Sequence, residues 1–138
     1  MSRACKQKKY SGADRLNKYL ASVRDKPFEW GVHDCVQFAR GAAEAQTGAE
    51  FPLPEYSGLR GALVACKRIC LVSELDKRFK RCAHVPPVGS IVAVQDTERE
   101  SIGYRLGVVV SDKAAFVSPS GLVFAKLRPE TDMYWIVA

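Results

Sequence analysis

The sequence predicts an α+β fold, with a helical N-terminal half followed by a small antiparallel β-sheet or half-barrel. In the first half of the chain, apolar residues recur at helical spacing. After Pro86 and Pro87 the pattern changes to short runs of β-branched and aromatic residues between turns. The chain has 138 residues, of which 47% are hydrophobic and 26% charged. This composition is ordinary for one globular domain with a single core.

Four helices are expected in the first half. They span residues 13–24, residues 35–46, a segment that starts near Ser57, and a segment from Ser73 to about Lys80. The first helix ends before Pro27, because the residue before a proline avoids the helical region. Gly48 ends the second helix. Ser73, followed three residues later by Asp76, resembles a capping box with the shorter acid and predicts the start of the fourth helix.

Five short strands are expected in the second half. They span residues 91–95, 105–111, 114–117, 122–126 and 134–137. Residues 119–121, Pro-Ser-Gly, predict a tight hairpin turn, and residues 96–101 form a charged loop. No internal repeat or low-complexity segment competes with this division of the chain.

The chain divides into a basic N-terminal leader, residues 1–12, and a single domain, residues 13–138. The leader carries Arg3, Lys6, Lys8 and Lys9 and almost no apolar residue. Because it has little to bury, we expect it to be flexible until it meets a partner. No apolar run approaches the ~18 residues of a membrane span, and the leader lacks the apolar stretch of a signal peptide. The sequence therefore predicts a protein made in a cytoplasm.

The segment from Trp30 to Cys35, Trp-Gly-Val-His-Asp-Cys, is the most informative stretch of the chain. Asp34 is placed to cap the second helix by accepting a backbone N–H two or three residues on. Cys35 then lies in the first helical turn, where unpaired N–H groups and the helix dipole stabilise a thiolate. The alternative is that Cys35 is a small buried residue of a core helix, since free cysteine is among the most buried residue types.

These residues resemble a known family. Phe28-Glu29-Trp30-Gly31 followed by Asp34-Cys35 resembles the nucleophile motif of the NlpC-type cell-wall cysteine peptidases, which are papain-like. The chain is also similar to small phage tail proteins related to that family, over roughly residues 14–138. The C-terminal part of the resemblance lies in Leu106-Gly107-Val108, Ala114-Ala115-Phe116, Gly121-Leu122-Val123-Phe124 and Tyr134-Trp135-Ile136. The resemblance implies a nucleophile helix, with Cys35 at its start, packed on the sheet.

The resemblance also implies a histidine base, and this chain lacks one at the matching position. The family's His-Val-Gly-Ile strand aligns with Arg105-Leu106-Gly107-Val108, so Arg105 stands where the base is expected. The following strand, residues 114–118, offers no His, Asn or Gln to orient a base. We expect a structural or exposed role for His33, and nothing in the sequence brings His84 to Cys35. Cys35 is then either vestigial or a nucleophile whose base is not located, because the guanidinium of Arg105 favours a thiolate by its charge but cannot accept a proton near neutral pH.

The five cysteines, an odd number, predict free thiols rather than a disulfide framework. Cys66 and Cys70 are four residues apart and share a face of the expected helix. With Cys82 and Cys5 they are weak candidates for a metal or iron–sulfur site. Buried free thiols are the favoured interpretation, so no cofactor is expected.

The formal net charge is +6, and the basic residues form a second group beyond the leader. This second group comprises Lys67, Arg68, Lys77, Arg78, Lys80 and Arg81. The sequence lacks the interleaved aromatic residues of a base-stacking surface and any recognised DNA-binding helix pair, so no specific nucleic acid is expected. Solvated faces or contacts with acidic protein neighbours are favoured.

We therefore expect a structural component of a bacteriophage tail tip or baseplate, built on an inactive NlpC-type fold. The expected location is the virion, after synthesis in the host bacterial cytoplasm. The expected partners are hub and tail-tip subunits, contacted through the basic leader and the edge bearing Trp135, with peptidoglycan as a further candidate. The alternative is an active cysteine peptidase or amidase that cuts peptidoglycan during genome entry. A third, weaker hypothesis is a metal-bearing or cluster-bearing tail-tip module.

Overall fold

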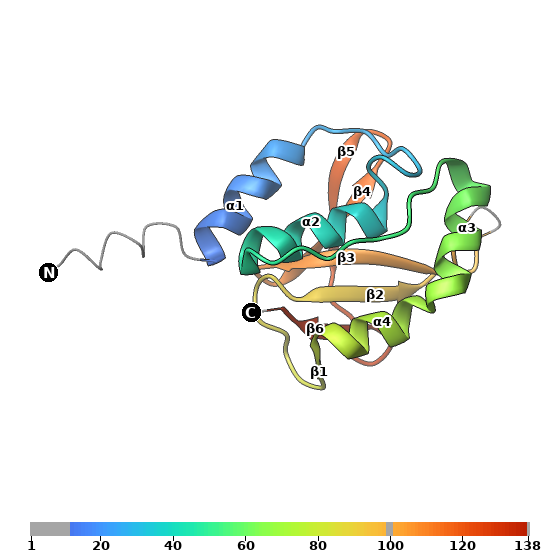
Figure 1. Cartoon of the computed structure of the whole chain (residues 1–138). Coiled ribbons are helices and arrows are strands. Elements are labelled where there is room, and N and C mark those ends of the chain that lie inside the picture. Colours follow the sequence, from blue (N-terminus) through green and yellow to red (C-terminus); the bar gives the residue numbers. More distant parts are fainter. Residues whose placement is uncertain (1–11, 99–100, 138) are drawn as a thin grey trace, which may run out of the picture.

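The computed structural model describes residues 12–98 and 101–137 and has four helices followed by a six-stranded antiparallel open sheet (Figure 1). This confirms the α+β class and the division into a helical front and a strand-rich back. The leader predicted over residues 1–12 lies outside the described residues, except Gly12, which opens the first helix. No helix in the described part of the chain is long and apolar enough to cross a membrane.

The helices agree with the sequence in number and order. They are α1 (Gly12–Val23), α2 (Cys35–Thr47), α3 (Gly58–Ile69) and α4 (Leu71–Arg78). Helix α1 buries Leu16 and Val23, as its apolar spacing requires. Helix α2 ends at Gly48, which has a φ of 76°. Glycine adopts this left-handed conformation without the steric cost that a Cβ would bring.

The predicted start of the fourth helix is wrong by two residues. Helix α4 begins at Leu71, because Cys70, with a φ of 53°, makes a left-handed turn that ends α3 and starts α4. Ser73 therefore lies inside α4 rather than at its cap, with its Oγ 3.3 Å from Sγ of Cys70. The helix also ends at Arg78, before the Lys80 expected from the sequence.

The sheet contains one strand that the sequence did not predict. The strands are β1 (Lys80–Cys82), β2 (Ile91–Gln95), β3 (Tyr104–Val110), β4 (Lys113–Ser118), β5 (Gly121–Lys126) and β6 (Met133–Ile136). Strand β1 has only three residues and no apolar alternation, so it carries no strand signal. Pairing with β6 at the edge of the sheet makes it a strand.

The sheet has the strand order β1-β6-β2-β3-β4-β5, with every pair antiparallel. The last strand of the chain, β6, therefore lies between β1 and β2. Helix α2 packs on β3 and is itself packed against α1, while α4 contacts β1 (Figure 1). The start of α2 consequently lies against the central part of the sheet.

Successive side chains along each strand point to opposite faces of the sheet. On the face covered by helices, Phe38 of α2 packs in one cluster with Val108 and Ala115. The expected packing of α2 on the strands that contain Val108 and Phe116 is thereby confirmed. The side chain of Phe116 itself points to the opposite face of the sheet, where it packs in a cluster with Val109.

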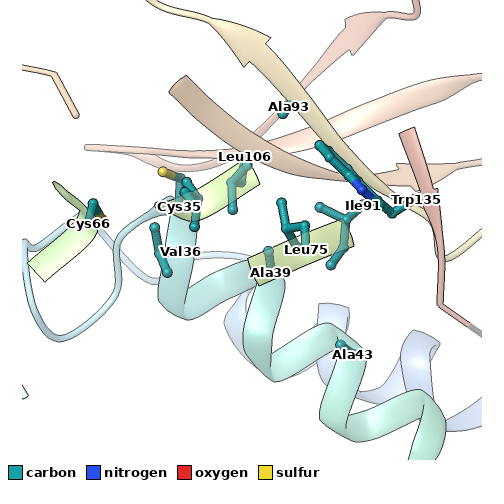
Figure 2. Packing of buried hydrophobic residues seen from close by; sticks show 11 residues of the cluster. Cys35, Val36, Ala39, Ala43, Cys66, Leu75, Ile91, Ala93, Leu106 and Trp135 are labelled. Atoms are coloured by element: carbon teal, nitrogen blue, oxygen red, sulfur yellow. The ribbon is translucent and has the colours of Figure 1, made fainter. Parts of the chain in front are cut away.

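Trp135 is fully buried, at 0% exposure, in the cluster that also contains Cys35 and Ile91 (Figure 2). The expectation that an edge bearing Trp135 contacts a partner is therefore wrong. From its sequence alone, an aromatic strand fits either an exposed edge of the sheet or its interior. Strand β6 lies in the interior of the sheet, because it pairs with a strand on each side.

Candidate functional site

The turn before α2 is held by Asp34, whose carboxylate is fully buried. Its Oδ1 accepts the backbone N–H of Gln37 at 2.9 Å, which confirms the predicted cap. Its Oδ2 accepts the backbone N–H of Gly31 at 2.9 Å and the hydroxyl of Tyr56 at 2.6 Å. Three donors thus satisfy the buried charge. Asp34 is a structural centre that fixes the turn, the helix start and the loop of Tyr56 together.

Gly31 is required at its position for two reasons. Its φ is 84°, and a Cβ there would meet the backbone oxygen of Tyr56. The loop that carries Tyr56 therefore lies directly on the turn. The rings of Trp30 and Phe28 meet edge to face, with centroids 4.8 Å apart. The motif residues Trp30, Gly31 and Asp34 are accounted for by packing and hydrogen bonding.

Cys35 lies in the first turn of α2, as predicted, and its side chain is 5% exposed. Its Sγ lies 4.0 Å from the backbone oxygen of Tyr104 on β3. Burial raises the pKa of the Cys35 thiol to about 12, although a hydrogen bond donated by the backbone N–H of Leu106 and the charge of Arg105 act to lower it. The neutral thiol is favoured. This is the opposite of the thiolate expected from the helix start alone and agrees with the alternative of a buried core cysteine.

Cys35 and Arg105 border the same surface cleft, whose volume is about 480 Å³. The cleft is also lined by Phe28, Glu29, Trp30, Asp96, Glu98, Ser101, Tyr104, Val117 and Pro119. The structure thus brings together the two residues that the resemblance assigns to the nucleophile and base positions. Three carboxylates lie around the same cleft, so its charge is mixed rather than cationic.

The guanidinium of Arg105 is packed on an aromatic ring. Its Cζ lies 5.3 Å from the centroid of Phe116. Gly107 makes room for this ring, because a Cβ at that position would lie 2.6 Å from a carbon of Phe116. A guanidinium on the face of an aromatic ring gains a cation–π interaction. Arg105 therefore has a packing role that needs no catalytic function.

Neither histidine lines this cleft in the described part of the chain. His33 is 3% exposed and packs edge-on against Phe38, with ring centroids 6.2 Å apart. Burial, with the nearby charge of Lys26, lowers the pKa of His33, and its Nε2 has no hydrogen-bond partner. The structural role expected for His33 fits this burial. His84 is exposed in the connection between β1 and β2.

The remaining described cysteines do not meet. Cys66 is buried near Cys35, and burial raises the pKa of its thiol to about 11 (Figure 2). Cys70 is exposed, and hydrogen bonds from Ser73 lower the pKa of its thiol. Cys66 and Cys70 line one cleft, although Cys70 lies just past the end of α3. Across the described residues, no group of three or more His, Cys, Asp or Glu side chains is arranged to hold a metal ion, and Cys82 is a free thiol near the backbone oxygen of His84.

Two features of the site were missed by the sequence analysis. Tyr56 binds Asp34 from a proline-rich loop that carries no motif. Among the described cysteines, the pKa is lowered at Cys70 and raised at Cys35. The left-handed backbone at Cys70 sets this arrangement, and a non-glycine residue with positive φ has no reliable sequence signal.

A family described as a domain of unknown function, DUF6950, matches residues 8–137. The chain belongs to the DUF6950 family. It matches no curated protein and no solved structure. The Asp34 turn, the Cys35 cleft and all six strands lie within the part that matches DUF6950. These features are therefore placed in the DUF6950 domain itself rather than in an extension of it.

Proposed function

We propose that the chain is a structural component of a bacteriophage tail tip or baseplate, built on an NlpC-type, papain-like fold that does not hydrolyse peptides. The absence of peptide hydrolysis is inferred from the burial and protonation of Cys35. Its thiol is buried and held neutral, and the residue at the expected base position is Arg105. The virion location and the tail context come from the resemblance of the sequence to small phage tail proteins.

The argument against hydrolysis is one of proton transfer. A cysteine peptidase needs a base within hydrogen-bond reach of the sulfur, and a guanidinium stays protonated at neutral pH. General acid–base catalysis contributes roughly 10²–10⁴ in rate. Without an imidazole in the described cleft, and with a thiol pKa raised to about 12, this contribution is lost.

The arrangement of the elements supports the NlpC-type part of the proposal. The motif residues Asp34 and Cys35 open a helix that packs on β3, the strand in which the resemblance places the base position. In the proposed role, the domain contacts hub and neighbouring tail subunits. The basic residues of the leader, Arg3, Lys6, Lys8 and Lys9, are the candidate contacts, because Trp135 is buried.

Hydrolysis is tested by incubating the purified chain and its Cys35→Ala variant with muropeptides and measuring released amine. We expect equal background rates for the two proteins. A release that depends on Cys35 would contradict the inactive fold and support the alternative, an active peptidase or amidase. That alternative draws on one observation, which is that Cys35 and Trp30 line a cleft open to solvent.

The assembly role is tested separately, in particles. An epitope-tagged chain expressed during phage production is expected to appear in purified tails. A truncated chain lacking residues 2–10 is expected to fold, judged by thermal unfolding, but to be incorporated less. Absence of the full-length chain from purified tails would contradict the proposed role, whatever the outcome of the hydrolysis assay.

A further inference from the structure

A small apolar pit lies between α2, α4 and the loop that follows α2. Its volume is about 60 Å³. In Figure 2, Ala39, Leu75, Ile91 and Leu106 gather around this space between α2 and the sheet. The outer wall is formed by the loop residues Phe51, Pro52 and Leu53 and by Phe79. Most of the side chains that line the pit are thus apolar.

Three charged residues, Arg40, Glu74 and Arg78, also line the pit. Arg40 borders the pit and also a neighbouring groove of about 400 Å³, which passes Gln37, Pro54, Glu55 and Tyr56. Its Nε is buried and has no hydrogen-bond partner. No salt bridge of Arg40 is found among the described residues. A guanidinium has five N–H donors in a fixed fork, so this group is prepared to bind an anion.

The nearby carboxylates are used elsewhere. Oε2 of Glu44 accepts the backbone N–H of Phe51 at 2.8 Å and thereby holds the loop over the pit. Glu74, which also lines the pit, pairs with Lys77 at 3.3 Å and with Arg78 at 3.2 Å. Glu55 borders the groove without an ion pair to Arg40. The charge of Arg40 is therefore not matched by a carboxylate of the described chain.

We propose that this pit and groove bind the C-terminus of a partner peptide that ends in an aliphatic residue. The last side chain fills the pit, the terminal carboxylate binds Arg40, and the preceding residues follow the groove toward Tyr56. The size of the pit favours this occupant, because an apolar cavity that holds benzene has a volume of ~150 Å³. The pit, at about 60 Å³, is smaller and better suited to the end of an aliphatic side chain than to an aromatic ring.

This site is independent of the proposed tail function. Cys35 lines neither the pit nor the groove, so peptide binding at Arg40 does not require any property of the thiol. A carboxylate is the fitting anion, since Arg forms bidentate pairs with carboxylates. The apolar pit beside it selects a carboxylate that is attached directly to an aliphatic residue.

The test uses the full chain, labelled with ¹⁵N and titrated by NMR with the peptide acetyl-Ser-Gly-Ser-Leu as the free acid. Matched probes are its C-terminal amide, the same peptide ending in Gly, and 4-methylpentanoate. We expect the free acid to bind at least tenfold more tightly than the amide and than the peptide ending in Gly. We expect it to bind more tightly than 4-methylpentanoate, which cannot reach the groove. Shifts are expected at the backbone amides of residues 39–43 and of Phe51, Leu53, Glu55 and Tyr56.

Two variants test the role of the guanidinium. Arg40→Gln is expected to weaken binding of the free acid at least tenfold and to leave binding of the amide unchanged. Arg60→Gln is the matched control, because Arg60 is exposed on α3 and lines neither the pit nor the groove.

Equal affinity for acid and amide, or no binding of the acid at millimolar concentration, would overturn the proposal. Affinity for 4-methylpentanoate equal to that for the peptide would also overturn it, in favour of a small-molecule site. If Arg40→Gln does not fold, the relative affinities of the wild-type chain for the four probes still test the proposal.

Discussion

The indole nitrogen of Trp135 donates a hydrogen bond to Oδ1 of Asp76 at a distance of 2.8 Å. This contact joins the last strand, β6, to α4, across 59 positions of sequence. The same carboxylate accepts two hydrogen bonds from Arg81, both at 3.1 Å, and the Arg81 guanidinium lies 5.0 Å from the centroid of the Trp135 ring. Helix α4, strand β1 and strand β6 are thus tied together through one carboxylate.

Replacing Asp76 with Ala is expected to destabilise the fold, because the fully buried indole loses its acceptor. A buried donor left unpaired costs about 1–3 kcal/mol. The measurement is the free energy of unfolding in urea. Glu74→Ala is the control, since Glu74 makes only surface ion pairs with Lys77 and Arg78, which contribute little. Equal losses for the two variants would show that the Trp135 contact is unimportant.

The sequence was informative where the determinants are local. The cap at Asp34 requires one side chain and the N–H groups that follow it, so the start of α2 was predictable to the residue. The end of α2 at Gly48 needed only the freedom of glycine to adopt a positive φ. Short runs of β-branched and aromatic residues between turns were sufficient to place strands β2 to β6.

Features that depend on distant parts of the chain could not be predicted. Strand β1 exists because β6 pairs with it, and its own three residues favour no structure. The neutral state of Cys35 arises from burial under β3, which outweighs the helix dipole that the local sequence suggests. The binding of Tyr56 to Asp34 joins residues 22 positions apart without a motif. Tertiary packing decides each of these.

Removal of the Asp34 carboxylate is expected to be among the most damaging single changes. Asp34→Ala loses the cap of α2 and leaves Gly31 N–H and the Tyr56 hydroxyl without their acceptor, which together cost about 3 kcal/mol. Tyr56→Phe removes one of these bonds and is expected to cost about 1 kcal/mol. Both values are measured by urea unfolding. Asp25→Ala, at an exposed position, is the control, and a loss as large as that of Asp34→Ala would refute the central role of Asp34.

Among the described cysteines, Cys70 is expected to react first with iodoacetamide. Its thiol is exposed and has a lowered pKa, whereas the Cys35 thiol is buried and has a pKa of about 12. Only the thiolate is the nucleophile, so at pH 7.5 the label is expected at Cys70 well before Cys35. Peptide mapping by mass spectrometry after short reaction times measures the order. Cys70→Ser should abolish the fast labelling at that position, and early labelling of Cys35 would show that its thiol is active after all.

The two histidines give a sharp test of pH dependence. Burial lowers the pKa of His33 below its usual value of 6.5, so the unfolded chain binds a proton at a higher pH than the folded chain does. Stability should therefore fall as the pH drops from 6.5 toward the lower pKa of the folded state.

The free energy of unfolding, measured in urea between pH 7.5 and pH 5, is expected to decrease in the wild type. In His33→Gln this decrease should be smaller. His84→Gln is the matched control, because His84 is exposed and should leave the pH dependence as it is in the wild type. If His33→Gln retains the full decrease, the buried imidazole of His33 is not its source.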